Sequence, residues 1–262
     1  MQRLRRLLRR RAVRHSEGVF VMEGPTLVGE ALAAGAAVES LYVAPGARRL
    51  PAVTELCHRA LDAGARVFDL GPGVLERVAD TVTPQPVLAV VHMPQATLLS
   101  LAAPSFVVVC IDVRDPGNTG AVIRAADGAG ADAVVCCDGT ADAFNPKTVR
   151  ASAGSVLHLP VVQGCSGEEA LRALASMGLR RLAAVAHGGR SPVETDLAVP
   201  LALVLGNEAH GMPPSLGELI DGTLTISLDE RAESLNVSLA AAVLCFEVRR
   251  QRSNLLGVEP AP

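Results

Sequence analysis

Three separate segments of the chain combine glycines with polar side chains in patterns that could bind a ligand and act on it. The first reads Asn-x-Gly-x-x-x-Arg, and it carries Asn118 and Arg124 shortly after an apolar run. Its glycines allow a tight turn into a helix whose first N–H groups have no partner within the helix. Taken alone, this segment is also explained by an asparagine near the N-cap and an arginine on the helix surface.

The second segment reads Leu-Gly-Asn-Glu-x-x-Gly over residues 205–211, at the end of another apolar run. Its first glycine would let a ligand approach the backbone closely. Glu208 would then place a carboxylate beside that ligand. The alternative is an ordinary turn between a strand and a helix.

The third segment reads Ile-Ser-Leu over residues 226–228 and is followed by Ser-Leu-Asn-Val-Ser over residues 234–238. Ser234 is a natural N-cap for a final helix. Capping explains Ser234 well, but it explains Asn236 poorly, so Asn236 is a candidate for another role.

The elements that position these segments alternate between strand and helix. We expect strands over 106–111, 133–136, 159–162, 182–185, 201–205 and 224–228, and helices over 118–129, 146–151, 168–177 and 235–250. Continuous apolar strands are typical of a parallel sheet that is covered on both faces. The sequence therefore predicts an open α/β sheet with helices on both faces. Ligands bind such sheets at the carboxyl ends of the strands, where all three segments fall.

The first part of the chain predicts a smaller α/β unit. Helices are expected over 26–34, 53–63 and 73–79, and strands over 41–43, 67–68 and 87–91. Residues 94–104 are rich in Pro, Ala and Ser, which is typical of a linker. We therefore predict an N-terminal domain over 1–93, with an extension over 1–19, and a second domain over 105–262.

Charge is distributed unevenly along a chain whose formal net charge is −3. Arginines crowd the first fourteen residues without any acidic residue among them: Arg3, Arg5, Arg6, Arg9, Arg10, Arg11 and Arg14. Such a block could neutralise phosphates of a nucleic acid. The alternative is a frayed N-terminal helix whose charges are solvated.

Composition argues against several other classes of protein. Aromatic residues make up only 2% of the chain, which disfavours a broad base-stacking platform. No apolar run is long enough to cross a bilayer, and no secretory signal is evident. The six cysteines form no C-x-x-C pair and the six histidines show no metal-ligand spacing, so we expect no metal site. A reducing cytoplasm is the simplest compartment.

The order and spacing of the three segments resemble the signature motifs of the SpoU (TrmH-type) RNA 2′-O-ribose methyltransferase family, within the SPOUT superfamily. Residues 145–155, Asn-Pro-Lys-Thr-Val-Arg-Ala-Ser-Ala-Gly-Ser, look like the connecting segment of that family. Residues 21–24 and 83–90 look like parts of its N-terminal substrate-binding domain. The resemblance covers nearly the whole chain, except for the arginine-rich start and the tail.

The resemblance implies a fold, a cofactor and a set of site residues. It implies a deep trefoil knot near the C-terminus and a homodimer that uses an apolar stripe of the final helix (Leu235, Leu239, Ala242, Val243 and Phe246). S-adenosylmethionine would bind at Gly206, Asn207, Ile226, Leu228, Leu235 and Asn236. The catalytic residues would be Arg124, Asn118, Glu208, Ser234 and Asn236. RNA would contact Arg3, Arg5, Arg6, Arg9, Arg10, Arg114, Lys147 and Arg150.

The reaction implied is in-line transfer of a methyl group to a ribose 2′-hydroxyl, in which positioning supplies much of the acceleration. The resemblance assigns Arg124 to removal of the hydroxyl proton. A guanidinium ion gives up a proton only at a large cost, so orienting the ribose phosphate and stabilising the developing alkoxide is an easier task.

Several alternatives stay open at this stage. The separate N-terminal domain favours rRNA over tRNA as the substrate. A base methyltransferase, a non-catalytic RNA-binding or assembly protein of the same fold, and an ordinary nucleotide-dependent α/β enzyme are the other candidates.

Overall fold

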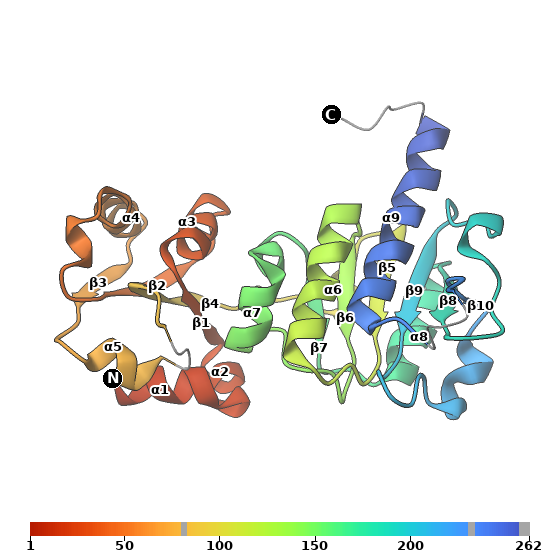
Figure 1. The fold of residues 1–262 in the computed structure, drawn as a ribbon, viewed down its shortest axis with the longest axis horizontal. Helices are drawn as coiled ribbons and strands as arrows, with labels where there is room; N and C mark the ends of the chain where they lie inside the picture. Colours follow the sequence, from red (N-terminus) through yellow and green to blue (C-terminus); the bar gives the residue numbers. More distant parts are fainter. Residues whose placement is uncertain (80–82, 230–233, 257–262) are drawn as a thin grey trace. The chain divides into compact units, whose positions relative to one another are not determined.

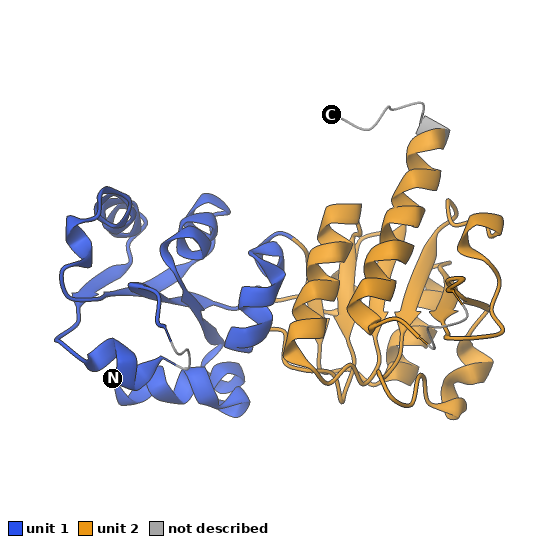
Figure 2. Ribbon diagram, viewed as in Figure 1, with its two compact units in different colours: residues 1–94, 144–158 blue, residues 95–143, 159–262 orange. Residues whose placement is uncertain are grey.

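The computed structural model describes residues 1–79, 83–229 and 234–256. The chain forms two compact units, which Figure 2 colours separately. Unit 1 contains residues 1–94 and 144–158, and unit 2 contains residues 95–143 and 159–262. The chain therefore passes between the units three times, at residues 94–95, 143–144 and 158–159.

Unit 2 is built on the parallel sheet that the apolar runs predicted. Its strands are β5 (Phe106–Cys110), β6 (Ala133–Cys136), β7 (Val161–Gln163), β8 (Arg180–Ala184), β9 (Leu201–Leu205) and β10 (Gly222–Leu224). They lie in the order β10-β8-β9-β5-β6-β7, and every pairing is parallel. From β5 the chain first adds β6 and β7 on one side of the sheet, and it then adds β8, β9 and β10 on the other side. The carboxyl ends of the neighbours β5 and β9 therefore lie at the point where the direction of strand addition changes. Ligands bind at this point in open parallel sheets.

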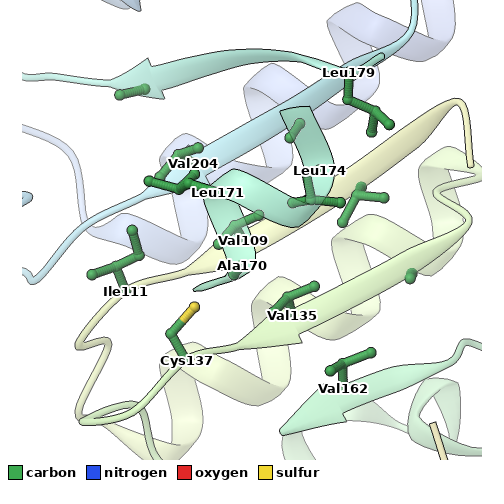
Figure 3. Close-up of a cluster of buried hydrophobic side chains, with 14 of the residues drawn as sticks. Val109, Ile111, Val135, Cys137, Val162, Ala170, Leu171, Leu174, Leu179 and Val204 are labelled. Carbon is green, nitrogen blue, oxygen red and sulfur yellow. The ribbon is translucent and has the colours of Figure 1, made fainter. Parts of the chain in front are cut away.

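Helices cover both faces of this sheet, which confirms the prediction. Helices α6 (Pro116–Ala129) and α9 (Val237–Leu256) lie side by side on one face (Figure 1). Helix α8 (Gly167–Ser176) covers the other face together with the 3-10 segment η5 (Pro214–Leu219). Figure 3 shows Leu171 and Leu174 of α8 against Val109 and Val135 of the sheet. Residues 94–104, predicted as a linker, contain η2 (Leu98–Ser100), and Leu98 and Leu101 pack against this same core.

The last strand and the last helix differ from their predicted bounds. Strand β10 ends at Leu224 rather than at residue 228, because the backbone turns to bond with the loop after β8. Arg190 pairs with Leu224 there: Arg190 N donates to Thr223 O at 2.9 Å, and Thr225 N donates to Arg190 O at 3.0 Å. Gly189 permits this approach, since a Cβ on it would lie 2.7 Å from Leu224 C. Helix α9 starts two residues later than expected and continues to Leu256.

Unit 1 contains a mixed sheet of four strands in the order β1-β4-β2-β3. The strands are β1 (Val19–Glu23), β2 (Val38–Val43), β3 (Arg66–Asp69) and β4 (Val87–His92), of which only β2 and β3 are parallel neighbours. Helices α3 (Pro25–Ala33) and α4 (Pro51–Asp62) pack on one face. Helices α1 (Gln2–Arg9), α2 (Arg11–Glu17) and α5 (Val74–Val78) pack on the other. Strand β1 was not among the predicted strands; its five residues are all buried and show no alternation.

The arginine-rich start is part of the unit 1 core, which corrects its description as an extension. Leu4, Leu7 and Leu8 form an apolar stripe along α1 that packs against the sheet. Arg14 is only 2% exposed and donates to the carbonyl of Leu7 at 2.8 Å. The positive charges of α1 therefore stand on the outer side of a helix that is fixed in place.

Residues 144–158 were expected within the second domain, yet they pack in unit 1. This segment contains α7 (Pro146–Ser152) and η3 (Ser155–Leu157) and lies against β1. The Phe144 ring lies 4.9 Å from the Phe20 ring, centroid to centroid. Arg150 Nη1 donates to the carboxylate of Glu23 at 3.2 Å, and that carboxylate is 4% exposed and also accepts from Gln85 N. A segment that leaves the parallel sheet of unit 2 after β6 thus packs into the core of unit 1.

We expect Arg150→Ala to lower the free energy of unfolding by about 2 kcal/mol in urea denaturation. Breaking a fully buried pair costs about 3–5 kcal/mol, and the exposed third of Arg150 reduces that figure. Arg172→Ala is the control, because it removes an exposed pair with Glu168 within α8 and should cost under about 0.5 kcal/mol. Equal losses of unfolding free energy in the two variants would show that the Arg150–Glu23 pair contributes no more to stability than an exposed pair does.

Candidate active site

The first motif lies at the start of helix α6, which follows the carboxyl end of β5 and has its own N-terminal cap. Asp115 is the N-cap, and its carboxylate accepts from Asn118 N at 2.9 Å, while Pro116 occupies the first turn. The helix therefore begins two residues before its predicted start. Because Asp115 does the capping, the side chain of Asn118 is available for other contacts.

Three residues from three motifs join in one chain of hydrogen bonds. Asn236 Nδ2 donates to Asn118 Oδ1 at 3.1 Å, and Asn118 Nδ2 donates to Glu208 Oε1 at 3.0 Å. These residues are 90 and 118 positions apart from Asn118 in the sequence. The structure thus brings together three of the five predicted catalytic residues. The Asn118 amide, itself oriented by Asn236, holds one carboxylate oxygen of Glu208 in a fixed direction.

Asn236 also corrects the predicted cap of the final helix. The carbonyl of Asn236 accepts from Ala240 N at 2.9 Å, and its Oδ1 accepts from Ser238 N at 2.9 Å. Asn236, and not Ser234, is therefore the N-cap of α9. The same side chain uses its oxygen for the cap and its nitrogen for Asn118, so one residue ties the helix start to the first motif.

Asn207 fixes the loop after β9 to the end of β5. Its Nδ2 donates to the carbonyl of Asp112 at 2.9 Å and to the Asp112 carboxylate at 3.1 Å, while its Oδ1 accepts from Ala209 N and His210 N. Asp112 has a φ of 58°, a left-handed conformation that is uncommon for a residue with a side chain. Asn207 was predicted to bind the cofactor; its side-chain amide makes these four contacts within the protein.

A cavity of about 410 Å³ opens beside this network at the ends of β8 and β9. Its size falls in the range of small-molecule sites. It is lined by five of the six predicted cofactor residues, Gly206, Asn207, Ile226, Leu228 and Leu235, and by two predicted catalytic residues, Glu208 and Ser234. Apolar side chains with one carboxylate at the edge suit a ligand that has an adenosine part and a positive centre, as S-adenosylmethionine does.

Gly206 shapes the wall of this cavity. A Cβ at this position would lie 2.5 Å from Gly211 C and 2.6 Å from Met212 N, which is closer than real Cβ atoms approach backbone. Asn207 and Gly211 exchange two backbone hydrogen bonds of 2.9 Å across the same turn. Glycine is therefore required by the close packing of two backbone segments.

Two predicted catalytic residues stay outside the network. Ser234 lines the cavity and is exposed. Arg124 is exposed on α6, and within the described part of the chain no hydrogen bond or ion pair is recorded for it. Its guanidinium group is thus free of carboxylate partners among those residues and can meet an anionic substrate.

The cavity also has a wall that the sequence analysis missed. Residues Ala184, Val185, Ala186 and His187 at the end of β8 line it. The sequence feature that could have indicated this wall is the pair Gly188 and Gly189, which directly follows His187. At Gly189 the backbone passes close to Thr225, which leaves no room for a Cβ atom. A glycine pair after a buried strand would have indicated a fourth segment at the same edge of the sheet.

The predicted RNA-binding residues fall into two groups. Arg3 donates to Glu17 at 2.6 Å and to Glu39 at 2.6 Å, Arg114 pairs with Asp112 at 2.8 Å, and Arg150 pairs with Glu23. Arg5 donates to the carbonyl of Arg77. By contrast, Arg6, Arg9 and Arg10 are exposed and have no acidic partner among the described residues, and the same holds for Arg11, a neighbouring arginine outside the predicted set. Lys147 is exposed at the start of α7.

Comparison with known proteins places this geometry in a family. Residues 105–246 match the SpoU rRNA Methylase family, and residues 1–89 match an MRM3-like substrate binding domain. The chain belongs to the SpoU rRNA methylase family. A 23S rRNA (guanosine(2553)-2′-O)-methyltransferase of Bacillus subtilis is 38% identical over 90% of each chain.

Solved structures agree with this assignment. The SpoU methyltransferase AviRb of Streptomyces viridochromogenes, in complex with AdoMet, superposes with a TM-score of 0.86 at 29% identity, over 96% of this chain and 97% of that one. An AdoMet-bound rRNA methyltransferase of Sinorhizobium meliloti gives a TM-score of 0.84 at 28% identity, over 95% and 93%. These matches confirm the predicted activity, methylation of an RNA ribose 2′-hydroxyl, and the predicted cofactor. Among the helices described, none has the length and apolarity that crossing a membrane requires.

Proposed function

We propose that this SpoU-family methyltransferase modifies a ribose of large-subunit rRNA. The observation that carries the proposal is the hydrogen-bonded chain of Asn236, Asn118 and Glu208 at the edge of the cofactor cavity. The substrate-binding unit supports an rRNA substrate, as does the relative that methylates 23S rRNA.

The proposed roles follow from these positions. When bound, S-adenosylmethionine supplies a methyl group on a sulfonium centre. The apolar cavity wall excludes water from that centre, and the backbone at Gly206 and the side chains of Ile226 and Leu228 hold the adenosine. Glu208, fixed by Asn118, accepts a hydrogen bond from the attacking 2′-hydroxyl and takes its proton as the bond from oxygen to the methyl group forms. Arg124 binds the adjacent phosphate and stabilises the alkoxide that develops as the proton leaves.

Methyl transfer to separated RNA classes tests the proposed substrate. Labelled S-adenosylmethionine is incubated with the protein and either protein-free large-subunit rRNA or total tRNA. We expect incorporation into the rRNA only. Incorporation into tRNA alone would overturn the proposal in favour of a tRNA enzyme. Cofactor binding without incorporation into either RNA would favour a non-catalytic RNA-binding role.

We also propose that the protein is a homodimer, with a knotted C-terminus, and that it works in the cytoplasm. Leu239, Val243 and Phe246 are about half exposed on one side of α9, and Phe246 lies against Gly128 of α6. A contiguous exposed apolar stripe is typical of a protein–protein interface, which supports a dimer contact along α9. Light scattering that gives the mass of a single chain at micromolar concentration would contradict the dimer.

The exposed arginines of α1 and α2 are proposed to contact RNA phosphates. We expect Arg6→Gln combined with Arg9→Gln to reduce the slope of log K against log salt by about 2, because each lost phosphate contact removes about one unit. Arg172→Gln, on α8, is the control and should leave the slope unchanged. A slope equal to that of the wild type in the double variant would exclude this face from RNA binding.

A further inference from the structure

Two aromatic rings meet on the exposed edge of the unit 1 sheet. The chain has one tyrosine, five phenylalanines and no tryptophan, yet Tyr42 and Phe68 lie opposite each other on β2 and β3. Their ring centroids are 5.3 Å apart and their planes differ by 21°. The Arg66 guanidinium carbon lies 5.8 Å from the centroid of the Phe68 ring. We call Tyr42, Phe68 and Arg66 the aromatic edge patch.

The patch is supported from below and open outward. Tyr42 is half-buried and packs against the core under α1 and α5. Phe68 is 41% exposed, and the Arg66 side chain is 66% exposed. Strand β3 is the last strand of the sheet, so within the described residues only its edge toward β2 is paired. The core therefore fixes the inner ring, while the outer ring and the guanidinium face solvent.

Stabilisation of the edge strand explains the contact between the rings, because cross-strand aromatic pairs stabilise a sheet. It does not explain why the second ring is left exposed. Other exposed apolar side chains of unit 1, such as Leu50 and Leu61, stand singly on helices or loops. Phe68 differs from them because its ring contacts both the Tyr42 ring and the Arg66 guanidinium group and is still 41% exposed.

Charge at the patch is locally balanced. Arg66 donates to Glu39 at 2.9 Å, Glu39 also accepts from Arg3, and Arg48 pairs with Asp69 at 2.6 Å. The Arg3 contact lowers the pKa of Glu39, so this carboxylate stays ionised. Hence the patch has little net charge for binding phosphates, unlike the outer face of α1. What it offers to a ligand is a π face and a guanidinium plane.

We propose that the aromatic edge patch stacks an unpaired nucleobase of the RNA substrate. Sequence-specific proteins recognise single-stranded loops of RNA by stacking splayed bases on aromatic rings and arginine planes. The proposal rests on the proposed function, because it takes RNA as the substrate. Under this proposal unit 1 has two RNA-binding surfaces: the arginines of α1 and α2 bind phosphates, and the aromatic edge patch binds a base.

Binding of protein-free large-subunit rRNA by two Phe68 variants tests the need for a π face. Phe68→Leu keeps an apolar side chain without the ring and should weaken binding roughly five- to 150-fold, the range for the loss of one stacked base. Phe68→Tyr should bind within about twofold of the wild type, because the ring is kept. The salt slope should be unchanged in both, since no phosphate contact is lost. Turnover at saturating RNA should be preserved, so the effect falls on KM.

A second measurement detects the stack directly. Phe68→Trp introduces the only tryptophan of the chain, and a base that stacks on it should quench its fluorescence as RNA is added. Leu61→Trp is the matched control, since Leu61 is 52% exposed on α4, over the opposite face of the sheet. Quenching at position 68 alone supports the proposal. No quenching at position 68, in a variant that still binds RNA, would overturn it.

The outcomes separate this inference from the proposed function. If the wild type methylates RNA and Phe68→Leu binds RNA as the wild type does, the inference alone fails. If Phe68→Leu retains RNA binding but lowers the self-association of the protein, the patch is a protein contact and the inference fails. If the wild type methylates no RNA, the proposed function fails independently of Phe68.

Discussion

Arg124→Ala is expected to reduce methyl transfer by at least about 100-fold at saturating RNA and cofactor. A donor placed where charge develops in the transition state contributes on the order of 100- to 1,000-fold. Arg124 is exposed on α6, within the motif that also holds Asn118, and no partner is recorded for it among the residues described. Because it does not line the cofactor cavity, the affinity for S-adenosylmethionine should stay within about twofold of the wild type.

Two measurements distinguish an effect of Arg124→Ala on methyl transfer from an effect on cofactor binding. Equilibrium binding of S-adenosylmethionine and single-turnover methyl transfer separate affinity from chemistry. Arg124→Lys keeps the charge but loses the planar fork of donors, so it should recover only part of the lost rate. Turnover like that of the wild type in Arg124→Ala would remove Arg124 from the mechanism.

Gly206→Ala is expected to weaken S-adenosylmethionine binding by more than about tenfold and to lower stability by about 1–3 kcal/mol, the usual cost of overpacking. The added Cβ would lie 2.5 Å from Gly211 C, so the turn between Asn207 and Gly211 must move. That turn forms the wall of the cavity. Titration calorimetry with the cofactor and thermal unfolding measure the two effects.

Gly217→Ala is the matched control for Gly206→Ala. Gly217 lies in η5, its φ is not positive, and a Cβ there would meet no atom within 4 Å. The control should therefore change cofactor affinity and stability very little. If Gly206→Ala also binds the cofactor with full affinity, the close packing at this glycine has no functional consequence.

The parallel sheet could be predicted because its strands carry the signal in their own residues. Phe106–Cys110 and Leu201–Leu205 are continuous apolar runs, and burial on both faces requires that pattern. For the last strand the pattern misled: it predicted residues 224–228, whereas β10 is Gly222–Leu224 and the backbone after Leu224 bonds to the loop at Arg190. Packing of residues 144–158 in unit 1 depends on Phe20 and Glu23, which are more than 100 positions away in sequence.

The sequence singled out three polar residues that meet in the structure, but it did not show the structural task of each. The motifs identified Asn118, Glu208 and Asn236 by type and spacing, and the hydrogen bonds confirm that these three residues meet. Local patterns could not show that Asp115 and Asn236 are the helix caps, since Ser234 is an equally good cap by residue type. Likewise, pairing of Arg3 with Glu17 and Glu39 depends on tertiary contacts that charge counting does not contain.

The most direct test of the central claim is the chemical identity of the methylated product. The protein is incubated with S-adenosylmethionine that carries a labelled methyl group and with protein-free large-subunit rRNA, and the RNA is digested to nucleosides. The account predicts that the label resides in a 2′-O-methylated nucleoside, which protects its 3′ phosphodiester from alkaline cleavage. Label found only on a base would contradict the account, because the site would then activate a ring atom rather than a ribose hydroxyl.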